Sequence, residues 1–390
     1  MGFPMTEIHE VSPRENVGRD TIARYEAQFR AACIESLSLL ESAKKDKIYC
    51  DLHDDYVARY VSLGKTTYRF VQVKTRASQR KNLTMNEVFG LLKRKKKGSA
   101  NNLEDSYFGK MILHIINFKS SCIEISLQTN VEYDEDTNSI IEDIENQRIE
   151  SKHTTTLISE IKKLTEFTSH TEAQILLELQ KLKIETGLPY LRGEDTYFIP
   201  IAIEKIREYS EIELQHTESV EILKNILDLV RNKSRNKIHK DITASDLDAI
   251  AGITLHDLLN ILSISSTGYE ILKSSGDSRA IKNTSILQRF LRNSGFPESM
   301  IPELIQLKVN WDDWFSVRRH KVPDFSLSIF TSKIQETVEK LISHELKFKS
   351  LQSELPKLKC ELETISGLDG LTEELLLGSV LKEFVWINSK

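Results

Sequence analysis

The chain has 390 residues, and its 53 Lys and Arg against 58 Asp and Glu give a formal net charge of −5 at pH 7. This length suits two or three domains, or one domain with a large extension. The net negative charge excludes the overall basic character that marks many nucleic-acid-binding proteins. Any contact with nucleic acid therefore has to come from local basic patches. With only 15 Gly, 8 Pro and 28% charged residues, the composition is typical of a mostly helical globular protein.

Several classes of protein are excluded because their signals are missing from the sequence. No apolar run approaches the roughly 18 residues of a membrane span, and the polar N-terminus is unlike a signal peptide, so we expect a cytoplasmic protein with no membrane partner. The four cysteines are scattered without a C-x-x-C pair, which favours reduced thiols. The absence of Walker, G-x-S-x-G and H-E-x-x-H motifs excludes ATPases, serine hydrolases and zinc proteases.

The first predicted element is a long helix that follows an N-terminal loop. Asp20 is suited to cap its start, and apolar residues from Ile22 onward recur at helical spacing, so we expect a helix over residues 20–43. Arg24 and Gln28 are four residues apart and therefore share one face of this helix.

Strands and helices are then expected to alternate. The expected strands cover residues 47–52, 55–61, 67–74 and 122–127, and the expected helices cover residues 85–92 and 104–117. This order of helix, three strands, helix and strand is that of a restriction-endonuclease-like (PD-(D/E)xK-type) core. We therefore predict an α+β N-terminal core with a mixed sheet, followed by a mostly α-helical C-terminal region.

Beyond the expected core, helical patterns dominate. The acidic residues 131–150 show little apolar pattern and are expected to form a connector or an exposed peripheral helix. The aromatic segment 310–315 is interpreted as a packing corner, with a base-stacking platform as the alternative. Helices are expected over residues 156–167, 171–186, 201–209, 218–232, 244–250, 255–262, 284–293, 302–307, 326–352 and 372–385.

The motif Gln72-Val73-Lys74 is the most informative part of the sequence. Because side chains alternate along a strand, Gln72 and Lys74 point to one face while Val73 faces the core. A turn near Gly64 places Asp55 of the preceding strand roughly opposite Lys74. Metal-dependent nucleases build a phosphodiester-cleaving site from an acidic residue followed by an [Asp/Glu/Gln]-x-Lys pair. The alternative is an ordinary surface ion pair.

The same residues predict a magnesium site, with Mn²⁺ as an alternative ion. Carboxylate and carbonyl oxygens are the natural ligands of Mg²⁺, and Asp55 is the best candidate. Lys74 would hold the attacking water or neutralise the phosphate. Gln72 is a neutral and weaker ligand, so we expect help from Glu26 or Gln28 of the first helix.

Supporting residues are expected just before the hairpin. Asp51 and His53 share the face of Asp55 if the strand stays regular, whereas Asp54 faces the other way. The candidate set is therefore catalytic Asp55, Gln72 and Lys74, metal-binding Asp55, Gln72 and Glu26, and supporting Gln28, Asp51 and His53.

A basic stretch leaves the hairpin and extends past the next helix. Its candidate DNA-binding residues are Arg76, Arg80, Lys81, Lys93, Lys95 and Lys96. The run over residues 93–97 has two interpretations. It is a solvated helix C-terminus, where positive charge is favourable, or a contact to the phosphate backbone.

Three motifs carry a family resemblance. They are Arg14-Glu15-x-x-Gly18-Arg19-Asp20-Thr21-x-x-Arg24-Tyr25-x-x-Gln28, Asp51-x-His53-Asp54-Asp55 and Phe70-x-Gln72-Val73-Lys74-Thr75. Together they resemble the bacterial anti-phage dsDNA nuclease domain, clearly over residues 14–130 and loosely over 131–260. That domain is the nuclease half of oligonucleotide-activated CBASS effectors and also occurs in nucleases partnered with HerA-type hexameric ATPases.

The resemblance implies roles for individual residues. Asp55, Gln72 and Lys74 would form the active site, with Gln28 in support. Asp51 departs from the family pattern, because a glutamate is expected there and the aspartate has a shorter reach.

The resemblance also implies an organisation for the whole chain. The expected domains are a nuclease core over residues 14–150, a helical extension over 151–260, and a helical domain for assembly over 261–390. The helical C-terminus disfavours a fused cyclic-oligonucleotide sensor and favours a homo-oligomeric DNA endonuclease that acts on double-stranded DNA with a HerA-type ATPase. The alternatives are a CBASS-like effector, or a helical assembly or DNA-binding subunit with a degenerate nuclease site.

Overall fold

The computed structural model describes most of the chain, which folds into two compact units. The described residues are 16–40, 44–78, 80–93, 100–193, 195–210, 216–239, 241–262, 264–277, 279–343, 347–362, 368 and 370–388. We call Met1–Ile203 with Leu223–Leu255 the sheet unit, and Glu204–Ile222 with His256–Lys390 the helical unit. Within the described residues, no helix is both long enough and apolar enough to cross a membrane.

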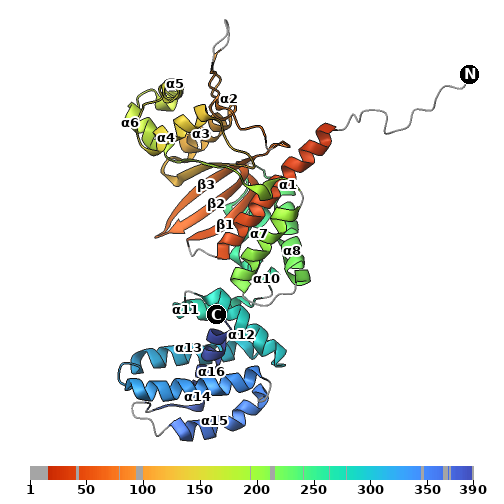
Figure 1. Cartoon of the computed structure of the whole chain (residues 1–390), viewed down its shortest axis with the longest axis vertical. Helices are drawn as coiled ribbons and strands as arrows, with labels where there is room; N and C mark the ends of the chain where they lie inside the picture. The colour runs from red at the N-terminus through yellow and green to blue at the C-terminus, as the bar shows by residue number, and fades with distance from the viewer. Residues whose placement is uncertain are drawn as a thin grey trace, which may run out of the picture. The chain divides into compact units, whose positions relative to one another are not determined.

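The sheet unit is built on a six-stranded mixed sheet (Figure 1). Its strands are β1 (Lys45–Leu52), β2 (Asp54–Ser62), β3 (Lys65–Lys74), β4 (Cys122–Thr129), β5 (Leu182–Glu185) and β6 (Gly252–Thr254), in the spatial order β5-β4-β3-β2-β1-β6. Neighbours among β3, β4 and β5 are parallel, and the other neighbouring pairs are antiparallel. The four predicted strands and the mixed sheet are therefore confirmed.

Helices cover the two faces of this sheet. Helix α1 (Asn16–Leu37) lies along one face, where its Glu35 reaches Tyr56 of β2 and Arg69 of β3. The other face carries α2 (Met85–Phe89), α3 (Tyr107–Phe118), α4 (Glu135–Glu145), α5 (Lys152–Ile161) and α6 (Glu172–Leu179), which Figure 1 shows grouped together. Their apolar side chains form one continuous core with Val57 and Phe70 of the sheet. Burial of this core drives the packing of helices on sheet.

Local sequence signals explain where helices of the sheet unit begin and end. Thr84 and Glu87 form a capping box at the start of α2, so the backbone N–H groups at that end find acceptors within the helix. Gly90 ends α2 with φ of 69°, a conformation that costs glycine little. A Cβ there would also lie 1.9 Å from the backbone oxygen of Asn102.

Three expectations for the sheet unit are wrong. Helix α1 begins at Asn16 and ends at Leu37, so Asp20 does not cap it but pairs with Arg24 and Arg192. The acidic segment contains α4, which is not peripheral, because Ile140 and Ile144 are buried between the acidic positions.

The third wrong expectation is the single helix over residues 171–186. Helix α6 ends at Leu179, and the four residues of β5 alternate between apolar and charged side chains and pair with β4. Strand β6 was also not expected. It is only three residues long and pairs with β1, about two hundred positions earlier in the chain.

The remaining helices follow the predicted pattern in part. They are α7 (Asp195–Ser210), α8 (His216–Arg235), α9 (Ala244–Ala251), α10 (Leu255–Ile261), α11 (Ser266–Ser274), α12 (Ala280–Asn293), α13 (Ile301–Arg318), α14 (Asp324–Ile342), α15 (Phe348–Leu362) and α16 (Glu373–Ile387). The described part of the helical unit contains no strand, which confirms its helical character. Helix α11 was not expected, and the single helix over 326–352 is wrong, because α14 and α15 are separate helices.

The aromatic segment 310–315 lies inside α13 rather than at a corner. Trp311 is 2% exposed, and its ring stacks on Phe330 of α14 with centroids 5.2 Å apart. A packing role therefore describes Trp311 better than a base-stacking platform, because its ring is covered by protein.

Candidate active site

The turn between β1 and β2 sets the geometry of the candidate site. Strand β1 ends at Leu52 and β2 begins at Asp54, which leaves His53 alone at the tip. Asp51 and His53 have φ of 51° and 61°, in the left-handed region that side chains other than glycine disfavour. This turn interrupts the regular strand alternation, and Asp54 and Asp55 make their contacts with different helices.

Asp55 lies between α1 and β3. Its Oδ1 accepts a hydrogen bond from Nε2 of Gln28 at 2.6 Å, and its Oδ2 accepts one from the backbone N–H of Val73 at 2.5 Å. Burial raises the pKa of Asp55 to about 6, although the nearby Lys74 ammonium acts in the opposite direction. The Lys74 ammonium also lies 5.8 Å from the ring centre of Tyr107 on α3.

The register of the hairpin differs from the predicted one by two residues. Ser62 pairs with Lys65 and Tyr56 pairs with Val71, so the continued register places Asp55 opposite Gln72 rather than Lys74. The reason is a two-residue turn, which is tighter than expected. Asp55 remains beside the motif, because its carboxylate binds the backbone between Gln72 and Lys74.

A cavity of about 220 Å³ opens beside Asp55. It is lined by Tyr25, Gln28, Phe29, Ala32, Asp51, Asp55, Ser234 and Arg235. Partial burial raises the pKa of Asp51, and neither Asp51 nor Asp55 has an ion-pair partner in the described part of the chain. The structure therefore brings Asp51 and Gln28 to Asp55, as expected. It adds Ser234 and Arg235 from the end of α8, which no nearby sequence motif indicates.

A second polar cluster lies on the α3 side of the strands. Nε2 of Gln72 donates to Oδ1 of Asp54 at 3.2 Å, and Oδ2 of Asp54 lies 3.0 Å from Nε2 of His114. Asp54 thus faces away from Asp55, as predicted. His53 does not share the face of Asp55, because its ring packs against Phe118 with centroids 5.4 Å apart.

Other predicted residues lie elsewhere. The carboxylate of Glu26 pairs with Arg231 of α8 at 2.9 Å, and no contact joins it to Asp55. A role for Glu26 as a metal ligand is therefore not supported by its position, since the guanidinium already occupies its oxygens.

The predicted basic residues are only partly available for DNA. Arg76 pairs with Glu87 at 2.5 Å, and Lys93 pairs with Asp136 at 2.7 Å. Arg80 and Lys81 are exposed and have no ion-pair partner among the described residues. Lys95 and Lys96 lie outside the described residues.

The donor atoms fit a hard divalent cation. Oε1 of Gln72, a residue next to the cavity but not part of its lining, is buried and has no hydrogen-bond partner among the described residues. The carboxylates of Asp51 and Asp55 lack ion-pair partners in the same parts of the chain. Carboxylate and amide oxygens are ligands that Mg²⁺ accepts while it keeps several waters. Over the same residues, no three His, Cys, Asp or Glu side chains gather in a metal-binding group, so water would complete the shell.

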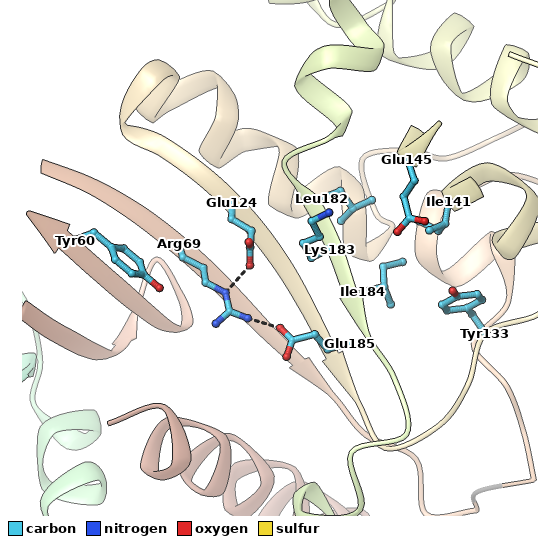
Figure 2. A pocket seen from close by; sticks show the side chains of 10 residues that line it. All are labelled: Tyr60, Arg69, Glu124, Tyr133, Ile141, Glu145, Leu182, Lys183, Ile184 and Glu185. Carbon is cyan, nitrogen blue, oxygen red and sulfur yellow. Dashed lines mark hydrogen bonds and ion pairs between the residues drawn. The ribbon is translucent and has the colours of Figure 1, made fainter. Parts of the chain in front are cut away.

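A second hollow of about 450 Å³ lies at the β5 edge of the sheet (Figure 2). In it, Arg69 forms ion pairs with Glu124 at 2.6 Å and with Glu185 of β5. The same guanidinium lies 3.2 Å from Glu35 of α1. Because these charges pair with one another, the charged residues of the hollow are better explained as a partly buried structural network than as a catalytic site.

Comparisons with known proteins point to one family. The family described as "Cap4, dsDNA endonuclease domain" matches residues 16–234, more than half of the chain. No curated protein sequence matches.

Two solved structures are similar to the chain at low sequence identity. One is the Acinetobacter baumannii Cap4 SAVED/CARF-domain containing receptor with the cyclic trinucleotide 2'3'3'-cAAA, with 11% identity, a TM-score of 0.38, and coverage of 73% of this chain and 57% of that chain. The other is the Moraxella osloensis Cap4 SAVED/CARF-domain containing receptor, with 13% identity, a TM-score of 0.36, and coverage of 74% and 67%. This chain thus spans little more than half of the first structure and about two thirds of the second.

Proposed function

Because the chain belongs to the family of Cap4 dsDNA endonuclease domains, we propose that it hydrolyses double-stranded DNA in anti-phage defence, with a divalent cation held at Asp55. One observation carries this proposal. Asp55 binds the backbone N–H of Val73, which places its carboxylate between Gln72 and Lys74, the residues whose chemistry the reaction needs.

Each residue of the site has a distinct role in the proposed reaction. Asp55 is ionised at neutral pH, since burial raises its pKa only to about 6, and Gln28 holds the carboxylate in place. Asp51 supplies a second carboxylate to the same cavity. Lys74 orients the attacking water or stabilises the charge on the phosphate. A bound Mg²⁺ would polarise the phosphate and favour ionisation of the water.

Arg235 completes the charge distribution of the cavity. Two carboxylates and one guanidinium line the same small volume, and Arg235 is exposed without an ion-pair partner among the described residues. Such a guanidinium is suited to a phosphate oxygen of DNA. We therefore assign Arg235 to substrate binding.

A second candidate function is a DNA-binding or assembly subunit whose nuclease site is inactive. The observation that favours it is Gln72, a neutral residue whose amide is bound to Asp54. This alternative predicts salt-dependent DNA binding without metal-dependent cleavage.

Plasmid cleavage distinguishes the two functions. The full chain with Mg²⁺ or Mn²⁺ is expected to cut plasmid DNA, and Lys74→Ala is expected to lower the rate by about a hundredfold or more, because electrostatic stabilisation of the transition state is lost. Lys65→Ala is the matched control, since Lys65 is an exposed lysine on the same strand. Cleavage by Lys74→Ala at the wild-type rate would refute the catalytic assignment.

The proposal extends to assembly and activation. The helical unit serves homo-oligomerisation, and a HerA-type ATPase activates the nuclease. Cleavage assays with and without a HerA-type ATPase test this activation, and light scattering measures the oligomer. If a cyclic oligonucleotide stimulates the purified chain and the ATPase does not, the CBASS-like alternative replaces the ATPase-partnered one.

A further inference from the structure

The side-chain amide of Gln72 has a fixed orientation. Its Nε2 donates to Oδ1 of Asp54 at 3.2 Å. An ionised carboxylate only accepts hydrogen bonds, so the amide nitrogen has to face Asp54, and Oε1 has to point away from it. The orientation of the amide is therefore set by its neighbour.

His114 holds Asp54 in turn. Oδ2 of Asp54 lies 3.0 Å from Nε2 of His114, which is the donor because the carboxylate can only accept. The imidazole stacks on Phe70, with ring centroids 4.3 Å apart and planes inclined by 10°. The side chains of Asp54 and His114 are 7% and 10% exposed, so water competes little for these hydrogen bonds.

The outcome of this arrangement is a buried amide oxygen that has no partner in the described part of the chain. Gln72 is 8% exposed, and its Oε1 accepts no hydrogen bond from any described residue. Buried acceptors are rarely left unsatisfied in folded proteins, and a cation is a natural partner for an amide oxygen. Asp55 lies nearby, since it binds the backbone N–H of the next residue, Val73.

We propose that Asp54 and His114 are positioning residues, which orient Gln72 so that its Oε1 serves as a neutral ligand of the divalent cation. This inference rests on the metal site of the proposed function. It also explains why position 72 is a glutamine. A glutamate there would place a second negative charge in direct contact with Asp54, whereas the amide gives Asp54 a donor and the cation an oxygen.

Binding of Mn²⁺ to the full chain, followed by electron paramagnetic resonance without DNA, tests the inference. Asp54→Ala is expected to weaken Mn²⁺ binding by about tenfold, the effect typical of losing a residue that orients a ligand. Asp54→Asn is expected to stay within about threefold of wild type, because the asparagine oxygen still accepts from Gln72. If Asp54→Asn loses as much affinity as Asp54→Ala, the charge of Asp54 acts on the ion directly and the positioning role is wrong.

A double-mutant cycle shows whether Asp54 acts through Gln72. Gln72→Met keeps the length of the side chain and removes the oxygen, so it should also weaken Mn²⁺ binding by about tenfold. Adding Asp54→Ala to Gln72→Met should then cause no further loss, since the group that Asp54 orients is gone. Additive losses in the double variant would overturn the inference.

His114→Phe separates the hydrogen bond from the packing. The phenyl ring keeps the stacking on Phe70 but cannot donate to Asp54. We expect weaker Mn²⁺ binding than wild type with a thermal midpoint of unfolding in EDTA that changes little. Wild-type Mn²⁺ affinity in this variant would show that His114 has no positioning role.

The outcomes for the inference and for the proposed function are distinguishable. If the Mn²⁺ pattern holds but no variant, wild type included, cleaves DNA, the nuclease assignment fails while the positioning role stands. If wild type cleaves DNA with Mn²⁺ and Asp54→Ala binds Mn²⁺ as tightly as wild type, the positioning role fails alone. If wild type binds no Mn²⁺, the inference and the metal site fall together.

Discussion

At the scale of single residues, the buried environment of Asp55 disfavours the ionised form of its carboxyl group. Burial raises its pKa from 3.8 to about 6, even with Lys74 nearby. A carboxyl group whose pKa is raised in the folded state stabilises the fold when protonated. That contribution is complete below pH 3.8 and is lost as the pH rises through about 6. Such a charge at neutral pH supports the proposal that a cation binds at Asp55.

The first prediction concerns the stability of Asp55→Asn. In EDTA at pH 7 this variant should unfold at a higher temperature than wild type. The gain should be at most about 3 kcal/mol in the free energy of unfolding, since each pKa unit corresponds to about 1.4 kcal/mol. Gln28 can turn its amide to pair with the asparagine. Thermal unfolding from pH 4 to 8 measures the difference, which should vanish at the acidic end.

Excess Mg²⁺ provides the internal control for this prediction. It should raise the unfolding temperature of wild type through binding to the ionised carboxylate, and it should leave Asp55→Asn nearly unchanged. A variant that is less stable than wild type at every pH would show that the hydrogen bonds of Asp55 outweigh the cost of its charge.

The second prediction concerns Arg235. Arg235→Ala should lower kcat/KM for DNA cleavage by about tenfold or more, because a hydrogen bond to a charged group contributes about 1.5–3 kcal/mol. It should also reduce the salt dependence of DNA binding, since one phosphate contact is lost. Lys224→Ala is the control, because Lys224 is an exposed residue of the same helix outside the cavity. Equal effects of the two substitutions would remove Arg235 from the substrate site.

At the scale of elements, the sequence predicted what depends on short-range periodicity. The alternation of apolar and polar residues was enough to predict strands β1 to β4. The spacing of Asp55 and Lys74 was enough to predict that the two residues lie near each other. The left-handed backbone of Asp51 and His53 has no such signal, because neither residue is a glycine. Strand β6 and Arg235 join the sheet unit from positions that only the tertiary fold brings close.

The ion-pair network of Arg69 joins four elements of the sheet unit. Its guanidinium pairs with Glu35 of α1, Glu124 of β4 and Glu185 of β5, and it extends from β3 itself. Burial opposes the charge of Glu35, but Lys45 and Arg69 keep the pKa of this carboxyl below its ordinary value. Glu124 and Glu185 therefore depend on Arg69 for their counter-charge, whereas Glu35 also pairs with Lys45.

The third prediction follows from this dependence. Arg69→Met should destabilise the sheet unit by about 3–5 kcal/mol, because Glu124 and Glu185 lose their counter-charge and the buried Glu35 keeps only Lys45. Lys162→Met, which breaks a largely exposed ion pair with Glu172 in the same unit, should cost less than about 1 kcal/mol. Urea unfolding followed by circular dichroism compares the two. A loss of similar size in both variants would contradict the central role of Arg69.

At the scale of the whole molecule, the chain forms two compact units. All three tryptophans, Trp311, Trp314 and Trp386, belong to the helical unit. Their fluorescence therefore reports on that unit alone, whereas circular dichroism reports on both. This distribution makes the two units separately observable in one sample.

The fourth prediction uses this difference. Urea transitions followed by tryptophan fluorescence and by circular dichroism should not coincide, because we expect the two compact units to unfold as separate cooperative bodies. Arg69→Met should move only the part of the dichroism transition that fluorescence does not follow. Coincident transitions in wild type, shifted together by Arg69→Met, would show that the chain unfolds as one body.

The sheet unit is built from two segments of the chain, and these segments are synthesised at different times. Strands β1 to β5 leave the ribosome first, then residues of the helical unit, and only afterwards α8 with Arg235 and the strand β6 that pairs with β1. A nascent or prematurely terminated chain thus carries Asp51, Asp55 and Lys74 long before the wall of the cavity contributed by Arg235 exists. The proposed DNA-cutting site is therefore not complete until translation has passed Arg235.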